Sequence, residues 1–214
     1  MANDYTTTTD AFADLTDDQF YATSTDTRFV TQMALYITAA SRLFDLEVGR
    51  WEGFFYPTSD SVDKYYDGNG GCELYVDEFA SISAVSVSEQ GGLASSDYTA
   101  YTSTDYFFAP YNYAVNAKPI TKIVVDEHNG SQMRFYGYRK AVKVTGIPGY
   151  STSIPAAIGQ ACKIQAIRWF MRAKQAYQDT GASVEMGSMK FTTKLQLDPD
   201  VKQILWPYKL ELDR

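Results

Sequence analysis

Two stretches of the chain repeat apolar residues every three or four positions, which is the spacing of one face of an α-helix. The first predicts a helix over residues 27–48, and Gly49 follows it as a stop signal. The second predicts a helix over residues 155–179, with Pro155 in the first turn and Gly181 at the end. Apolar residues surround much of this second helix, which indicates packing on two sides, one of them a candidate contact with another subunit.

Between the helices, residues 72–147 show the alternation and turn signals of β-strands. Ile82 and Ala84 share one face of a predicted strand while Val85 and Val87 share the other, and this change of phase predicts a bulge or burial on both faces. Asn129-Gly130 predicts a hairpin between two strands. The predicted strands are Glu73–Val76, Ser81–Ser88, Tyr98–Thr104, Ile120–Glu127, Gln132–Tyr138 and Ala141–Gly146.

Four other segments lack clean periodicity. Residues 50–71 and 107–117 are rich in aromatic side chains, and both are interpreted as loops. Residues 1–26, rich in Thr and Asp, predict an extended or partly ordered arm with a short helix near Thr16–Phe20. Residues 182–214 predict a second arm, irregular at first and then helical from a cap at Asp198 followed by Pro199.

The sequence therefore predicts an α+β fold. Two long helices and several short ones form a small bundle, an antiparallel β-domain is inserted between the long helices, and extended arms lie at both ends. The core spans residues 27–181, with arms over 1–26 and 182–214. Arms of this composition bury little surface alone and commonly become ordered against a partner.

Charge and composition narrow the classes of function. The formal net charge is −7 and the sequence pI is about 4.7; both disfavour free duplex DNA as a tight partner, because DNA affinity comes largely from Lys and Arg. No apolar run approaches the length of a membrane span, and no secretory signal is evident at Met1. Cys72 and Cys162 are expected to be free thiols in a reducing cytosol, with a disulfide left open. Aromatic residues make up 15% of the chain, which suits either a Tyr-rich core or protein interfaces.

No arrangement of residues for catalysis, metal binding or cofactor binding stands out. The single histidine, His128, adjoins the predicted Asn129-Gly130 turn, which is a surface position. The glycine-rich segments 67–71 and 91–92 match no phosphate-binding loop or calcium loop. Three carboxylate pairs are the remaining candidates for acid–base chemistry, and the first is the least unfavourable: Asp45 with Glu47, Asp77 with Glu78, and Asp126 with Glu127. We therefore expect a protein that is not an enzyme and has no cofactor.

Several segments, in order, resemble one family. The most telling is a Val-Thr-Gly-x-x-Gly-Tyr strand end, at 144–150, followed by a helix that starts at Pro155. The segments are Ile37–Arg42, Gly49-Arg50, Phe54–Pro57, Glu73–Phe79, Ile82 with Val85–Val87, Val142–Tyr150, Ile154-Pro155 with Ala161, and Val201–Tyr208. Over residues 28–208 this order resembles the gp6-like head–tail connector, or adaptor, proteins of tailed bacteriophages. The Tyr-rich region 98–117 and the Thr-rich N-terminus depart from compact members.

The resemblance implies a structural protein of the virion neck, assembled in the host cytoplasm. It implies a homo-oligomeric ring, usually of twelve copies, that binds the portal protein through its C-terminal region and receives the next neck or tail protein on its other face. It also implies a central channel through which double-stranded DNA passes without specific binding. An acidic surface would suit such a channel, because it repels DNA.

A closed ring uses two unlike faces of each subunit, and the candidates are the apolar arc of the 155–179 helix and the aromatic region 98–113. For the C-terminal arm, Trp206 and Tyr208 are the best candidate anchors. The alternative for each candidate is packing within the domain. Within the same class of protein, a stopper or tail-completion neck protein is the second hypothesis. A carbohydrate-binding module is a third, with Trp51 and Tyr111 as platforms. The candidate portal or intersubunit contacts are Tyr106, Phe107, Phe108, Tyr111, Tyr113, Trp169, Trp206 and Tyr208.

Overall fold

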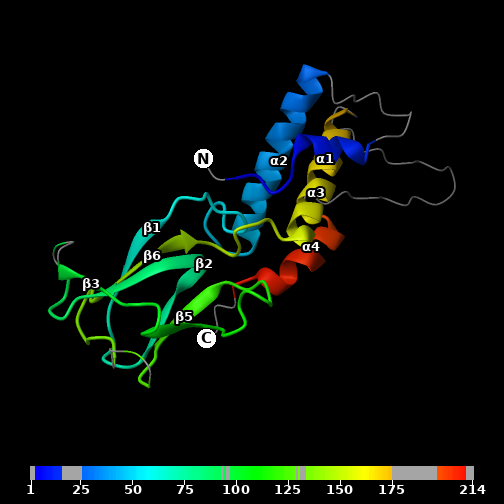
Figure 1. Ribbon diagram of the computed structural model, residues 1–214. Coiled ribbons are helices and arrows are strands. Elements are labelled where there is room, and N and C mark those ends of the chain that lie inside the picture. Colours follow the sequence, from blue (N-terminus) through cyan, green and yellow to red (C-terminus); the bar gives the residue numbers. More distant parts are fainter. Residues whose placement is uncertain are drawn as a thin grey trace, which may run out of the picture. The chain divides into compact units, whose positions relative to one another are not determined.

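The computed structural model describes residues 3–15, 26–92, 94, 97–128, 130, 134–174 and 197–210. The chain divides into two compact units. One, the helical unit, comprises Asp4–Glu52 and Pro155–Arg214, and the other, the sheet unit, comprises Met1–Asn3 and Gly53–Ile154. Helices and an antiparallel sheet are both present, so the α+β prediction is confirmed (Figure 1).

Two long helices dominate the helical unit, α2 (Thr27–Glu47) and α3 (Ala156–Lys174). Three shorter elements accompany them: α1 (Thr8–Ala13), α4 (Pro199–Leu205) and the 3-10 turn η2 (Trp206–Tyr208). The first residues of α2 are capped by Asp26, and Gly49 at φ +73° ends that helix, as its sequence predicts. Gly181 and the helix expected at Thr16–Phe20 lie outside the described residues.

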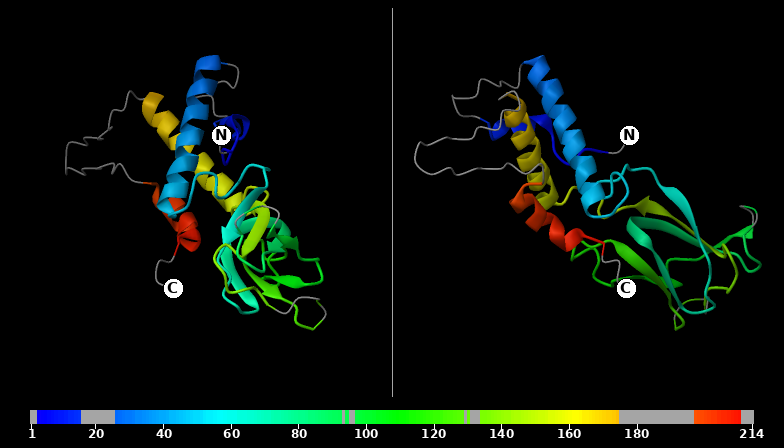
Figure 2. Two further views of the ribbon diagram at one scale, coloured as in Figure 1. Left: turned by 90° about the vertical axis from the view of Figure 1, so that its left-hand side faces the viewer. Right: turned by 180° about the vertical axis from the view of Figure 1, so that it is seen from behind.

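The wide apolar surface of α3 is used inside the helical unit. α1, α2 and α4 all pack on this helix, which Figure 2 shows from two further directions. Phe170 is fully buried, with ring centroids 5.9 Å from Phe12 and 5.8 Å from Phe29. Phe12 belongs to a segment that the sequence assigned to an extended or partly ordered arm. That segment forms a short helix because its apolar side chain has a place on α3.

A six-stranded antiparallel sheet forms the sheet unit. The strands are β1 (Val62–Tyr66), β2 (Glu73–Val87), β3 (Thr99–Ala100), β4 (Tyr106–Ala109), β5 (Ile120–Val125) and β6 (Val142–Pro148). Their order is β1-β6-β2-β5-β4, and β3 pairs with the end of β2. The core of this unit includes Phe79, Val85, Ile123, Phe135 and Val144, all fully buried.

Several strand predictions need correction. The two strands expected at 73–76 and 81–88 are one long strand, β2, whose register shifts between Ile82 and Ala84, where the phase change predicted a bulge. β1 lies in a region that was interpreted as a loop, and the strand expected at 98–104 contains only two residues. β5 and β6 lie close to their expected positions.

The hairpin prediction around Asn129-Gly130 was wrong. β5 pairs with β2 and β4, and residues 134–138 are not a strand. The backbone N–H of Phe135 instead donates to the carbonyl of Gly71 at 2.9 Å, and the Phe135 ring enters the core. A buried aromatic ring with a bond to a glycine turn replaces the ladder that the alternation predicted.

Candidate interaction surfaces

Strand β4 turns adjacent aromatic side chains to opposite sides of the sheet. It overlaps the start of the segment 107–117 that was interpreted as a loop, and Phe107 pairs with Val124 while Phe108 pairs with Ile123. Tyr106 and Phe108 pack against the core, with ring centroids 5.3 Å apart, and Phe108 also contacts Tyr113 at 6.1 Å. Phe107 is 49% exposed. Three of the five candidate contacts in this region therefore have a packing role, and Phe107 and Tyr111 remain available on the surface.

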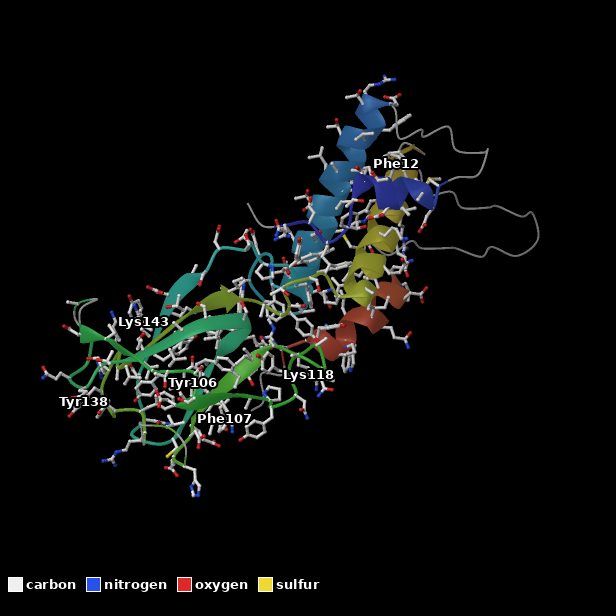
Figure 3. The ribbon with its side chains drawn as sticks, in the orientation of Figure 1. Phe12, Tyr106, Phe107, Lys118, Tyr138 and Lys143 are labelled. Carbon is white, nitrogen blue, oxygen red and sulfur yellow. The ribbon has the colours of Figure 1, made fainter. Side chains whose placement is uncertain are left out.

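Register places Phe107 on an exposed face shared with β2 and β5. Across β2, β5 and β4, Glu73 pairs with Val124, which pairs with Phe107. Two residues along, Tyr75 pairs with Lys122, which pairs with Ala109. Tyr75 is 72% exposed and Tyr111, in the turn after β4, is 71% exposed. We call this surface, formed by Tyr75, Phe107, Tyr111, Lys122 and Val124, the aromatic sheet face. Figure 3 labels Phe107 and its neighbour Tyr106 among the side chains of the sheet unit.

A single cation is held over the aromatic sheet face. The ammonium of Lys122 is 3.0 Å from the Glu73 carboxylate and 5.3 Å from the centre of the Tyr75 ring. The hydrogen bond with Glu73 is the largest cause that raises the pKa of Lys122 above its ordinary value, and the neighbouring Tyr75 and Tyr111 add to it. The face therefore combines three exposed rings with a neutralised charge, a composition typical of the centre of a protein interface.

The C-terminal helix presents Trp206 from a fixed support. Val201 and Leu205 are fully buried in the helical unit, whereas Trp206 is 73% exposed. The Asp198 carboxylate, which caps α4, accepts from Arg168, and the Asp198 N–H donates to the side-chain carbonyl of Gln165 at 3.1 Å. Beyond η2, the Lys209 ammonium pairs with Glu47 at 2.7 Å and the Leu210 N–H donates to the Val48 carbonyl at 3.0 Å. An exposed indole between two anchored ends loses little conformational entropy on binding.

The remaining candidate contacts in the helical unit are less exposed. Trp169 on α3 is half-buried and packs edge-on against Tyr36 of α2, with ring centroids 6.4 Å apart. Tyr208 in η2 is also half-buried. Five candidates thus lie in the sheet unit and three in the helical unit, and contacts with other chains remain a prediction for all eight.

Two exposed leucines on α2 were missed by the sequence interpretation. Leu35 is 65% exposed and Leu46 is 75% exposed. They are eleven residues apart, which is close to three helical turns, and Ala39 lies between them on the same exposed side. The signal was present, because both leucines fall outside the apolar stripe that predicted the helix. An apolar residue on the polar side of an amphipathic helix indicates a possible contact surface.

Five of the six carboxylates considered for acid–base chemistry have partners in the structure: Asp45, Glu47, Asp77, Asp126 and Glu127. Asp45 is buried, accepts from the Tyr5 hydroxyl, and lies 3.2 Å from the Arg42 guanidinium, whereas Glu47 pairs with Lys209. The imidazole of His128 is exposed in a turn after β5, and its backbone N–H donates to Asp126 at 3.0 Å. Across the described ranges, no three His, Cys, Asp or Glu side chains gather as metal ligands.

Other features of the described residues bear on the remaining alternatives. Trp51 belongs to the helical unit and Tyr111 to the sheet unit, so the two proposed carbohydrate platforms are not part of one unit. A hollow of about 340 Å³ in the sheet unit is lined by Asn3, residues 56–59, Ile147 and Thr152, without an acid or a base. No helix within the described ranges is both long and apolar enough to cross a bilayer. Cys72 and Cys162 are both free thiols.

No family model matches the sequence, and no curated protein matches it. Among solved structures, similar chains come from particles of a gene transfer agent. One, from the neck of an empty particle, is 14% identical, with 98% of this chain and 95% of that chain covered and a TM-score of 0.47. A chain from the virion of the native particle is 13% identical, with 98% and 95% covered and a TM-score of 0.45. A chain from the neck of the native particle is 13% identical, with 98% and 94% covered and a TM-score of 0.43.

Proposed function

We propose that this protein is a structural component of the neck of a phage-like particle, an adaptor that forms a ring between the portal and the next neck or tail protein. The observation that carries the proposal is the order of segments that resembles the gp6-like adaptors, together with the places these segments take in the fold. In this proposal the ring has a central channel for DNA and the subunit performs no chemistry.

Residues that carry the resemblance have packing roles in both units. Ser41 is buried in α2, accepts from the Tyr5 N–H at 3.0 Å, and lies 3.5 Å from the Cys162 sulfur on α3. In the sheet unit, the Tyr150 N–H donates to Phe54 at 2.7 Å, and its ring lies 6.0 Å from that of Phe54. The residues that carry the resemblance therefore stabilise the fold, and a fold in common is what we expect between structural subunits of one family.

Exposed apolar side chains supply surfaces of two kinds. The aromatic sheet face is built on strands and carries aromatic rings, whereas the Leu35–Leu46 side of α2 is helical and aliphatic. A ring requires two different surfaces on each subunit, because a heterologous contact joins one face to another. These two surfaces differ in shape and chemistry, and we assign them to contacts between neighbouring subunits.

The portal contact is assigned to Trp206, with Tyr208 beside it. Deleting the C-terminus after Lys202 would remove Leu205, which is fully buried, and would therefore disturb the helical unit itself. The substitution Trp206→Ala avoids this difficulty because the indole is largely exposed. Loss of an aromatic anchor from the centre of an interface typically costs about 2 kcal/mol or more, so portal affinity should fall about thirtyfold.

Co-sedimentation with portal rings from the same particle measures this effect. Trp51→Ala is the matched control, because Trp51 is another exposed tryptophan of the helical unit, and its affinity should change less than about threefold. Both variants should keep the wild-type melting temperature. Wild-type portal binding by Trp206→Ala would show that the C-terminal segment is not the anchor.

A further inference from the structure

Positive charge in the sheet unit is concentrated in one short segment. Residues 134–143 (RFYGYRKAVK) contain four of the seven Lys and Arg found in residues 53–154, and no Asp or Glu. The rest of residues 53–154 has eleven carboxylates against three cations. We call residues 134–143 the cationic segment. Its charge is opposite to that of its surroundings, which makes it a local site of attraction for anions.

Three of the four cations are exposed and available. Arg134, Arg139 and Lys140 have exposed side chains, and none forms an ion pair within the described ranges. Lys143 differs, because its ammonium lies 3.8 Å from the Asp63 carboxylate and 5.6 Å from the centre of the Tyr98 ring. Figure 3 labels Tyr138 and Lys143 at the same end of the sheet unit. The carboxylates that contact the segment, Asp63, Asp67 and Glu89, therefore bind its other groups and leave these three side chains without an ion pair in the described residues.

Hydrogen bonds hold the backbone of residues 138–140 in the cationic segment, although these residues are neither helix nor strand. The Lys140 N–H donates to the Asp67 carboxylate at 2.8 Å, and its carbonyl accepts from the Tyr98 hydroxyl at 2.7 Å. The Gly68 N–H donates to the Tyr138 carbonyl at 2.9 Å. The backbone at Arg139 and Lys140 is thus fixed before any partner arrives, which reduces the entropic cost of binding.

Lys140 occupies a backbone conformation that its residue type disfavours. Its φ is +50°, in the left-handed region where glycine is the usual residue. Glycine would relieve this strain, and it is common in the loops nearby, at positions 68, 70, 91 and 137. A lysine at a position that favours glycine indicates that its ammonium is used, since strained positions occur where a side chain has a function.

We propose that the cationic segment binds the phosphate backbone of duplex DNA, weakly and without sequence preference. Duplex DNA presents closely spaced phosphates, so several exposed cations can be neutralised at once. An acidic protein surface would form isolated exposed ion pairs with the same side chains, and such pairs contribute little affinity. The inference rests on the proposed function, in which DNA passes through the ring, and it identifies where the subunit touches that DNA.

Fluorescence anisotropy of a labelled 30-base-pair duplex of mixed sequence, titrated with the full chain, tests the proposal. If about three phosphates are neutralised, the affinity should fall about fortyfold between 50 mM and 200 mM salt. In the double variant Arg139→Ala, Lys140→Ala about one contact remains, so the same change of salt should lower the affinity only about threefold to fourfold. At 50 mM salt this variant should bind at least tenfold more weakly than the wild type.

Two further variants separate phosphate contact from general effects. Lys64→Ala with Lys118→Ala removes the same charge from the same unit, and its affinity should stay within about twofold of wild type. Lys140→Gly should weaken binding without lowering the melting temperature, because glycine fits the backbone at φ +50°. Equal losses in the two double variants, or a wild-type chain that does not bind at 50 mM salt, would overturn the proposal.

A competitor identifies the class of partner. A polyglutamate peptide of the same charge should displace the duplex poorly, and equal displacement would assign the cationic segment to an acidic protein instead. The binding assay uses the single chain and no portal. Failure to form a ring on the portal and failure to bind DNA are therefore separate results, the first against the proposed function and the second against this inference.

Discussion

The helical unit and the sheet unit both bury carboxylates, but they hold them in different ways. The helical unit buries a polar cluster, in which Asp45 lies with Tyr5, Arg42 and Ser41, and the ring of Tyr5 is 5.4 Å from the Arg42 guanidinium carbon. In the sheet unit the buried Asp105 and Asp126 accept from nearby backbone N–H groups, those of Thr102 and His128, and several aromatic rings lie on the surface. A buried ionic cluster depends on every member, whereas exposed rings can be removed singly with little loss of stability.

The buried cluster also explains how the N-terminal segment is attached. Tyr5 reaches two residues of α2, since its hydroxyl donates to Asp45 and its N–H donates to Ser41. Thr38 adds a hydrogen bond to Asp4 at 2.9 Å. Side-chain polarity thus holds a segment that has few apolar residues of its own, and the same cluster gives the helical unit a specific geometry.

Asp45→Ala should produce the largest loss of stability. It removes the partner of Arg42, leaving a mostly buried guanidinium beside Tyr5, and the free energy of unfolding should fall by about 3 kcal/mol. Urea denaturation measures the change. Glu47→Ala, which breaks the exposed pair with Lys209, should cost less than about 1 kcal/mol. If the two variants lost the same stability, the buried cluster would not be an important source of stability.

Phe108→Ala and Phe107→Ala form a matched pair in β4 that probes the two faces of the sheet. Phe108 packs on the core, so its loss should lower the free energy of unfolding by about 2 kcal/mol, less than for a fully buried ring. Phe107→Ala should change that free energy by less than about 0.5 kcal/mol. Sedimentation velocity should show weaker self-association for Phe107→Ala. Equal stability losses in both variants would contradict the assignment of the two faces.

The smallest predicted effect concerns the thiol buried in the helical unit. Burial raises the pKa of Cys162 from 9.0 to about 11, so the folded state favours the neutral thiol. Because the pKa of this thiol is higher in the folded state, its contribution to the free energy of unfolding is fully present below pH 9.0 and is lost as the pH rises toward about 11. The free energy of unfolding should therefore fall by about 1 kcal/mol between pH 8 and pH 10. Urea denaturation at both pH values should show this loss in the wild type, and it should be smaller in Cys162→Ala. Parallel pH profiles would contradict it.

The helices could be predicted from the sequence more accurately than the strands. Thr27–Glu47 follows from local spacing and Gly49, and α4 follows from Asp198 and Pro199. By contrast, Phe135 looked like part of a strand because its neighbours alternate, yet its position depends on Gly71, 64 residues away in sequence. Strand pairing depends on distant partners, and alternation alone does not name them.

The candidate surface was predictable in composition and not in detail. The aromatic segment 106–113 indicated an interface, but only strand pairing showed that Phe107 faces outward while Phe108 faces the core. Tyr75 was missed because it belongs to a separate strand, and register alone brings it to the same face. Leu35 and Leu46 carried a readable signal, since they break the polar side of α2.

Negative-stain electron microscopy of the wild-type chain mixed with portal rings from the same particle tests the adaptor proposal most directly. The proposal predicts an extra layer of density, coaxial with the portal and with the symmetry of a closed ring. Portal rings that remain bare at a high concentration of the chain would contradict it and would favour a stopper or tail-side protein.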